Sequence, residues 1–236
     1  MGDLVAGLRL RDERPAGGRP RVVADMVASV DGRAAVQGKS VALGHPVDRA
    51  LLRELRAEAD AILVGTPTLR AERYANLLDA EQRAARVAAG LPAHPIVVTV
   101  SRRLELPVEV PLLHEPGVRI LVHTESSASP PEVGAELEVV RCAPGKLTLP
   151  AVLADLGARG VRGVLCEGGP TLLRELIAQG RLDDLLLTVA PLVVGGDAPS
   201  ILAGPALPEP AAWALREVHR AGEHLFLHYV PAAGRG

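Results

Sequence analysis

Short runs of Val, Ile and Leu recur along the chain, with amphipathic segments between them. The runs are apolar at both odd and even positions, which is typical of strands buried on both faces of a mostly parallel sheet. They lie at residues 21–29, 61–65, 95–100, 118–123 and 162–167. This alternation of strand and helix patterns predicts an α/β protein.

Three of the intervening segments, 46–57, 148–160 and 170–180, repeat apolar residues at helical spacing. Pro46 suits the first turn of its helix because a proline there loses no hydrogen bond, and Thr148 is a candidate cap. We expect these helices to cover both faces of the sheet.

The C-terminal part of the chain has a different pattern. Strand-like segments at 183–196, 212–222 and 223–231 are joined by turns that contain Gly and Pro, which predicts antiparallel strands along one edge of the sheet. Residues 1–20 are broken by charges and glycines and are expected to form a flexible N-terminal arm. Residues 21–236 are expected to form a single domain.

Composition excludes several classes of function. The 236 residues carry 26 Lys and Arg against 28 Asp and Glu, a net charge of -2, which argues against a nucleic-acid or membrane-surface binder. No apolar run approaches the length of a membrane span. Cys142 and Cys166 lie far apart, and no histidines are paired at metal-ligand spacing, so we expect no metal site and no disulfide framework. A reducing cytoplasm suits this composition.

The stretch EGGPTLL is the first candidate for a binding site. Gly168 and Gly169 permit close approach to the backbone, and Pro170 opens a helix whose N–H groups favour an anion. An ordinary tight turn explains the glycines equally well. Glu167 favours the binding interpretation because it ends a buried strand, where the carboxyl ends of parallel strands form a crevice.

A second junction of this kind is GTPTLRAE. Gly65 ends a strand, Thr66 and Thr68 offer hydroxyl groups, and Glu72 offers a carboxylate near the same edge. A capped helix start explains one threonine but not the whole set. The turn at 29–32 has a common β-turn composition, and by itself it favours a structural turn.

Three stretches and their order resemble the reductase family of riboflavin biosynthesis, whose fold is similar to that of dihydrofolate reductase. They are residues 26–40, 55–74 and 166–196. The resemblance is to the C-terminal half of a bifunctional deaminase/reductase, and the ligand motifs of its zinc deaminase half are not found here. A stand-alone, homodimeric reductase is therefore expected.

The resemblance implies NADPH as the hydride donor and a ribosylaminopyrimidine of the 5-amino-6-(5-phosphoribosylamino)uracil type as the acceptor. Hydride transfer to the C1′ imine of the opened sugar gives a ribitylamino product. Such a transfer depends chiefly on alignment of the two reacting carbons in a dry site.

The resemblance also implies roles for individual residues. Thr68 matches a cofactor-contacting threonine, and Ser101 matches a contact to the region of the adenosine 2′-phosphate. Glu72 and Glu167 match acids at the reacting centre and are the candidate catalytic residues. The segment expected around the diphosphate contains Gly168, Gly169, Pro170, Thr171 and Leu172. The expected substrate-binding residues are Asp31, Ser40, Arg56, Glu72 and Glu167.

The chain departs from the family's pattern at three places. Residues 71–74 read AERY where the family usually has A-D-D-P, and Ala42 replaces an aromatic residue. Asp79 lies near the position of the arginine that binds the substrate phosphate in the family. These departures leave open a dihydrofolate, pterin or other small-molecule reductase, or a catalytically silent NADPH-binding homologue.

Overall fold

The computed structural model describes residues 8, 10–12, 15 and 17–232. Its strands are β1 (Arg21–Ser29), β2 (Ala61–Leu63), β3 (Ile96–Val100), β4 (Arg119–Thr124), β5 (Glu136–Arg141), β6 (Gly163–Cys166), β7 (Asp184–Ala190), β8 (Trp213–Ala221) and β9 (His224–Pro231). Its helices are α2 (Pro46–Glu58), α3 (Thr66–Glu72), α4 (Ala80–Ala88), α5 (Leu149–Ala158), α6 (Pro170–Ala178) and the 3-10 helix η1 (Pro111–His114).

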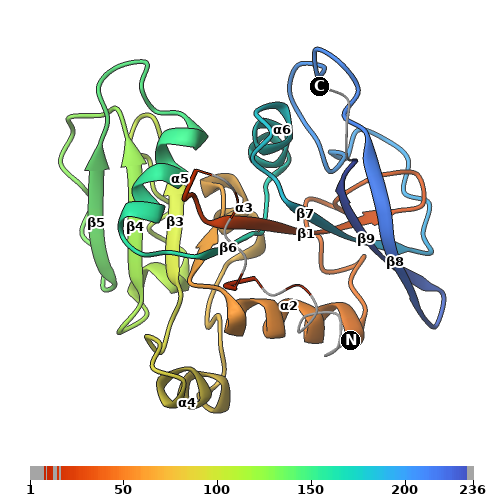
Figure 1. Ribbon diagram of the computed structural model, residues 1–236, viewed down its shortest axis with the longest axis horizontal. Coiled ribbons are helices and arrows are strands. Elements are labelled where there is room, and N and C mark those ends of the chain that lie inside the picture. Colours follow the sequence, from red (N-terminus) through yellow and green to blue (C-terminus); the bar gives the residue numbers. More distant parts are fainter. Residues whose placement is uncertain (1–7, 9, 13–14, 16, 233–236) are drawn as a thin grey trace.

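The nine strands form one sheet in the order β5-β4-β3-β2-β6-β1-β7-β9-β8 (Figure 1). The strands from β5 to β7 are parallel to one another, and β9 and β8 continue the sheet in antiparallel pairing. This confirms the mixed α/β architecture expected from the sequence. One detail of that expectation is wrong, because β7 pairs in parallel with β1. Helix α6 carries the chain back across the sheet before β7, so β7 runs in the same direction as β6.

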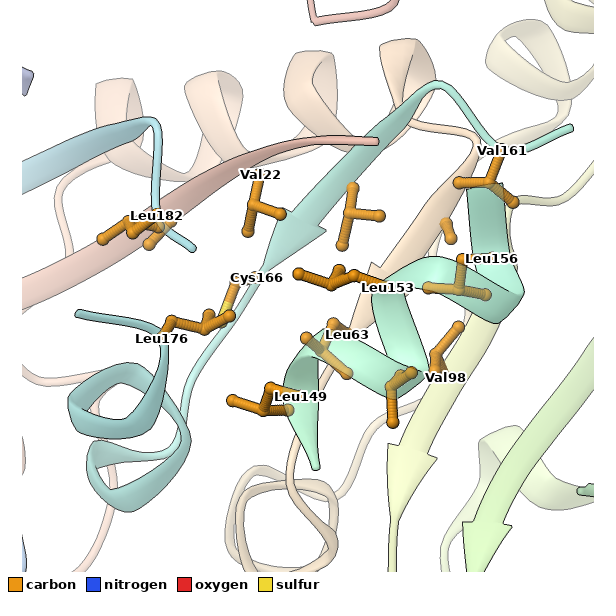
Figure 2. Packing of buried hydrophobic residues seen from close by; sticks show 14 of the residues in the cluster. Val22, Leu63, Val98, Leu149, Leu153, Leu156, Val161, Cys166, Leu176 and Leu182 are labelled. Carbon is orange, nitrogen blue, oxygen red and sulfur yellow. The ribbon is translucent and has the colours of Figure 1, made fainter. Parts of the chain in front are cut away.

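Helices cover both faces of the sheet, as expected. On one face, α5 and α6 bury Leu153 and Leu176 against Val22, Leu63 and Cys166 (Figure 2). Successive residues of a strand point to opposite faces, so Val23 lies on the other face, against α2. The predicted helix starts are also found, since Pro46 opens α2 and the Thr148 hydroxyl accepts a hydrogen bond from the Ala151 amide at 3.3 Å.

Part of the N-terminal segment is packed onto the domain. Leu8 and Leu10 are buried at 1% and 3% exposure among apolar residues of β1 and α2. Arg11 forms an ion pair with Asp60 at 3.0 Å. The prediction of a flexible arm over residues 1–20 is therefore wrong for Leu8 and Leu10, because both side chains are part of the core. Much of the remaining arm lies outside the described residues.

Within the described residues, no helix is long and apolar enough to cross a membrane. Cys142 and Cys166 are both free thiols. Burial raises the pKa of the Cys166 thiol to about 12, so this side chain behaves as an apolar core residue.

Candidate functional site

Two cavities meet where α3 and α6 begin. The larger cavity, of about 600 Å³, runs between the start of α3, the start of α6 and the start of α5. The smaller cavity, of about 300 Å³, extends from the same wall toward β1 and α2. Four residues line both cavities: Pro67, Thr68, Gly169 and Pro170. A ligand in one cavity can therefore contact a ligand in the other.

The wall between the cavities depends on the absence of a side chain at Gly169. A Cβ atom added there would lie 2.8 Å from Thr68 Oγ1, closer than such atoms approach. The Gly65 amide also donates a hydrogen bond to Gly168 O at 2.9 Å, which joins the two strand-to-helix junctions directly. The glycines in both motifs thus allow two backbone segments to come together at one edge of the sheet.

The first turn of α6 opens onto the larger cavity. Gly169 is the N-cap residue and provides no side-chain cap, so the N–H groups of the first turn keep their hydrogen-bonding capacity for a ligand. Pro170, Thr171 and Leu172 line this cavity. An uncapped helix start beside a glycine cradle suits the diphosphate of the nicotinamide dinucleotide that the family resemblance implies.

Carboxyl groups crowd the smaller cavity. Asp25 from β1, Asp48 from α2, Glu72 from α3 and Glu167 after β6 all line it. Strand β6 ends opposite Ala24 of β1, so beyond this residue β1 has no partner on that side and Asp25 borders an opening in the sheet. The cavity therefore lies at a notch in the sheet.

Glu167 is held by a buried ion pair. Arg56 Nε and Nη2 donate to its Oε1 and Oε2 at 2.7 and 2.6 Å, and the Tyr74 hydroxyl donates to Oε2 at 2.5 Å. Burial lowers the pKa of Arg56, but the Glu167 charge outweighs this and raises it above its ordinary value. Burial, followed by the Glu167 charge, raises the pKa of Tyr74. Arg56 and Tyr74 thus hold the Glu167 side chain in one orientation.

Asp25 has the opposite character. Its side chain lines the cavity, but its Oδ1 is buried without a hydrogen-bond partner in the described chain. Burial, then the charges of Asp48 and Glu167, raise the pKa of Asp25 well above its ordinary value, and Arg56 lowers it. Burial also raises the pKa of Asp48, against a hydrogen bond from Thr188 that lowers it.

The structure brings some predicted substrate residues together and separates others. Ser40 and Glu72 both line the smaller cavity, and the Ser40 amide donates to Glu72 Oε1 at 2.8 Å. Asp31 lies outside the lining. Its carboxylate accepts from the Ser29 hydroxyl at 2.6 Å and from the amides of Val194 and Gly195 at 3.0 and 2.7 Å, and these bonds hold its pKa well below the ordinary value. In this state Asp31 fastens two loops to each other.

Two predicted cofactor residues also lie away from the larger cavity's lining. The Ser101 side chain is buried and exchanges hydrogen bonds with the Glu105 backbone, whereas the next residue, Arg102, lines the cavity. The Gly168 amide donates to the Cys166 sulfur, and a Cβ at Gly168 would lie 3.2 Å from Met26 Sδ. Gly168 therefore shapes the turn beneath the cavity. The cofactor roles of both residues stay predictions.

A third cavity, of about 480 Å³, lies on the other side of Arg56. Four arginines line it, together with Asp79: Arg49, Arg53, Arg56 and Arg83. Asp79 caps α4 by accepting from the Gln82 amide at 2.8 Å. The family's arginine is absent near Asp79, as the sequence shows, but α2 and α4 supply arginines to this cavity from other positions. We call this the arginine cavity.

Sequence reasoning missed Asp25, Asp48 and Tyr74. Asp25 had a visible signal, since an ionisable residue in the middle of an otherwise apolar strand requires a partner or a function. Asp48 looked like an ordinary acidic residue in the first turn of a helix. Nothing local marks Tyr74 as a partner of Glu167, which lies 93 positions away in the sequence.

Comparisons with known proteins find a matching family and similar relatives. The family model of the RibD C-terminal domain matches residues 20–227. The chain is 30% identical over 220 residues to the 2,5-diamino-6-ribosylamino-4(3H)-pyrimidinone 5′-phosphate reductase of Methanothermobacter thermautotrophicus, covering 90% of this chain and 98% of that protein. It is 29% identical over 225 residues to the riboflavin biosynthesis protein RibD of Escherichia coli, covering 91% of this chain and 61% of that protein. The crystal structure of a pyrimidine reductase-like protein from Corynebacterium diphtheriae has a TM-score of 0.80 at 24% identity and 99% coverage of both chains, a similarity of fold.

Proposed function

Because this chain belongs to the family of the RibD C-terminal domain, we propose that it is an NADPH-dependent reductase of a ribosylaminopyrimidine in riboflavin biosynthesis. It converts the ribosylamino group to a ribitylamino group by hydride transfer to a C1′ imine. The observation that carries this proposal is the wall shared by the two cavities, formed by Pro67, Thr68, Gly169 and Pro170. Two ligands that each contact these four residues would touch one another there, as hydride transfer requires.

The cofactor is proposed to occupy the larger cavity, and when bound it supplies the hydride. The first turn of α6 would hold its diphosphate, and Thr68 and Gly169 would contact the part that reaches the shared wall. Arg102 offers a positive charge at the rim of the cavity, where its Nη1 lies 2.9 Å from Glu125 Oε2. A 2′-phosphate near this arginine would favour NADPH over NADH.

The substrate's ring and sugar are proposed to occupy the smaller cavity, beside Ser40, Glu72 and Glu167. The M. thermautotrophicus relative is named for a substrate with a 5′-phosphate. Here the arginine cavity would receive that phosphate, since Leu52 lines both cavities and Arg56 reaches from one to the other. Among the described residues no carboxylate forms an ion pair with Arg53, so its guanidinium group is available to a ligand.

Steady-state kinetics with several acceptors tests this function. Loss of reduced-nicotinamide absorbance is followed with 2,5-diamino-6-ribosylamino-4(3H)-pyrimidinone 5′-phosphate, its deaminated form, each of these without phosphate, and dihydrofolate. We expect turnover with a phosphorylated pyrimidine and NADPH. Turnover with dihydrofolate alone would support a pterin reductase, and NADPH binding without any turnover would support a silent homologue.

The arginine cavity has its own test. Arg53→Ala should raise KM for the phosphorylated pyrimidine about tenfold, as expected for the loss of one charged contact to phosphate, and should leave KM for the unphosphorylated pyrimidine unchanged. Arg216→Ala, an exposed arginine on β8, is the matched control. Equal effects of Arg53→Ala on both substrates would refute this placement of the phosphate.

A homodimer and a cytoplasmic location complete the proposal. Strand β8 forms one edge of the sheet and exposes Leu215 and Val218 at 49% and 51%. A second copy that covered this edge would shield its apolar side chains and its free backbone groups. Light scattering during size-exclusion chromatography tests the dimer, and a mass equal to one chain would contradict it.

A further inference from the structure

The proposed reaction needs a proton donor, and none of the residues predicted from the sequence was assigned that role. The donor identified below rests on the proposed function. Reduction of a C=N bond adds hydride to carbon and a proton to nitrogen. A group that carries a proton at neutral pH must therefore reach the substrate. In the described part of the chain, five ionisable side chains line the smaller cavity: Asp25, Asp48, Glu72, Tyr74 and Glu167.

Three of these groups are committed elsewhere. Both oxygens of Glu167 accept hydrogen bonds from Arg56, so this side chain is held in an ion pair. The Tyr74 hydroxyl gives its hydrogen to Glu167, and its raised pKa makes it a still weaker acid than an ordinary phenol. Glu72 Oε1 accepts a hydrogen bond from the Ser40 amide at 2.8 Å, which ties this side chain to the backbone. Of the five groups, the two aspartates are the carboxyl groups whose surroundings raise the pKa and so favour a bound proton.

The position of Asp25 suits a donor. It sits one residue beyond the last pair of β1 with β6, on the same face of the sheet as Val23, and it lines the smaller cavity. Its Oδ1 is buried and has no hydrogen-bond partner in the described chain. An ionised carboxylate with such an oxygen would pay a large desolvation cost, whereas a neutral carboxyl group would not.

The charges around Asp25 favour the neutral form. Asp48 from α2 and Glu167 after β6 both disfavour a second negative charge beside them. Arg56, the cation that faces Asp25, is already paired with Glu167. On the far side of Asp48, Thr188 of β7 donates to its carboxylate, and His224 of β9, with Arg49 and His45, favours its ionised form. These groups favour a charge on Asp48, whereas the carboxylates near Asp25 favour its protonated form.

We propose that Asp25 is the catalytic acid of this site. As hydride adds to the C1′ carbon, the π electron pair of the C=N bond takes the proton from the Asp25 carboxyl group, and a new N–H bond forms. Asp25 is left as a carboxylate and regains a proton from solvent after the product leaves. Asp48 acts as a positioning residue, because its charge keeps the proton on Asp25 between turnovers.

Two variants test this assignment by kinetics. Asp25→Asn should lower kcat about 100-fold or more, within the range of general acid catalysis, without changing NADPH affinity measured by fluorescence titration. Asp48→Asn removes a neighbouring charge, so the alkaline limb of the kcat profile should move to lower pH. Asp12→Asn, at an exposed position, is the control for an aspartate lost elsewhere. If Asp25→Asn raises KM but leaves kcat and its pH profile unchanged, Asp25 orients the substrate and the assignment is wrong.

A second measurement needs neither substrate nor cofactor. Infrared spectra of the free protein at neutral pH should contain the C=O band of a buried protonated carboxyl group, which Asp25→Asn removes and Asp12→Asn retains. A wild-type spectrum without that band would overturn the assignment. If the band is present but the wild-type protein reduces no pyrimidine, the proposed function fails and the catalytic role fails with it. Turnover by the wild type with an unimpaired Asp25→Asn variant would overturn the catalytic role alone.

Discussion

The larger and the smaller cavity share a wall, yet different kinds of residues line them. The larger cavity lies at the starts of α3, α5 and α6, and its lining includes Gly65 and Gly169. The lining of the smaller cavity includes five ionisable side chains, from β1, α2, α3 and the segments that follow α3 and β6. A surface of amides and glycines suits a ligand of fixed chemistry, such as a diphosphate. A surface of coupled carboxyl groups suits a reaction in which protons move.

The two cavities also differ in their effect on the folding stability of the protein. Backbone groups at a helix start are satisfied by water when no ligand is present, so the larger cavity adds little cost. The smaller cavity holds a buried ion pair between Arg56 and Glu167 and a carboxyl group on Asp25 that prefers to be neutral. Mutations in the smaller cavity should therefore change folding as well as activity, and those in the larger cavity should change mainly binding.

The largest effect is expected at Glu167. In Glu167→Gln, Arg56 stays charged in a site where its side chain is only 14% exposed, so the free energy of unfolding should fall by about 3 kcal/mol, the cost of leaving a buried charge unpaired. Substrate use should be impaired, and NADPH affinity should stay nearly unchanged. Urea denaturation and NADPH titration measure the two effects.

The control for Glu167 is a pair of the same chemistry at the surface. Arg70 and Glu109 lie 2.7 Å apart, but their side chains are 60% and 53% exposed. Glu109→Gln should leave stability nearly unchanged because solvent screens such pairs. A Glu167→Gln variant as stable as Glu109→Gln would show that the charge of Arg56 does not depend on this partner.

The next largest effect is expected at the shared wall. Gly169→Ala places a methyl group 2.8 Å from Thr68 Oγ1, so the two junctions must separate, and NADPH affinity should fall at least tenfold, with a larger loss for Gly169→Val. Isothermal titration measures the loss. At Gly65 an added Cβ meets atoms only at 3.6 Å or beyond, so Gly65→Ala is a matched control for a new methyl group in the same cavity.

A double variant separates two explanations for the effect of Gly169→Ala. Thr68→Ala removes the atom that the new methyl group would meet. If the double variant regains the affinity of Thr68→Ala alone, the methyl group acted by separating the junctions. If affinity is not regained, the methyl group obstructs the cofactor itself.

The sequence predicted the larger cavity better than the smaller one for a physical reason. The glycines, prolines and threonines around Gly65 and Gly169 act through local backbone geometry, which leaves a pattern within a few residues. The smaller cavity depends on which side chains meet across the fold. Asp25 and Asp48 share a cavity only because α2 crosses the face of β1 that carries Val23 and Asp25. No short stretch of the sequence predicts that crossing.

The fold shows the same division. The strands with continuous apolar runs, such as β1 and β3, begin and end within a residue or so of their predicted bounds. Strand β5 and helix α4 were not predicted. β5 is a partly exposed edge strand of sequence ELEVVR. Helix α4 has the sequence AEQRAARVA, in which the buried residue is Arg86 rather than an apolar one, and Asp79 and Gln82 cap it reciprocally. Both elements form because the rest of the fold provides a surface for them rather than because of a strong pattern of their own.

A smaller effect, on stability, is expected at Asp25, and its sign depends on pH. The pKa of Asp25 is raised in the folded protein, so between its unfolded pKa, about 3.9, and its folded pKa the native state binds more protons. Stability from this group is therefore full below the unfolded pKa and is lost as pH rises through the folded pKa. Asp25→Asn should raise Tm at pH 8 by a few degrees.

The acid end of the same experiment provides its control. Below the unfolded pKa of Asp25 the wild-type side chain is protonated in both states, so the difference in Tm between Asp25→Asn and the wild type should nearly disappear. Differential scanning calorimetry at pH values from about 3, below that unfolded pKa, to about 8 follows the change. A difference that does not depend on pH would mean that the amide stabilises the notch by packing or hydrogen bonding alone.

The smallest effect is expected at Arg102. This test asks whether a side chain in the larger cavity selects the ligand, as side chains are proposed to do in the smaller cavity. The Arg102 side chain is 65% exposed, so water screens its charge, and Arg102→Ala should weaken NADPH binding only about fivefold. NADH, which lacks the 2′-phosphate, should bind the variant and the wild type equally. Raising the salt concentration should reduce the wild-type preference for NADPH toward that of the variant. A preference that survives both the substitution and high salt would place the 2′-phosphate contact on the buried side of β3, near Ser101, as the sequence first predicted.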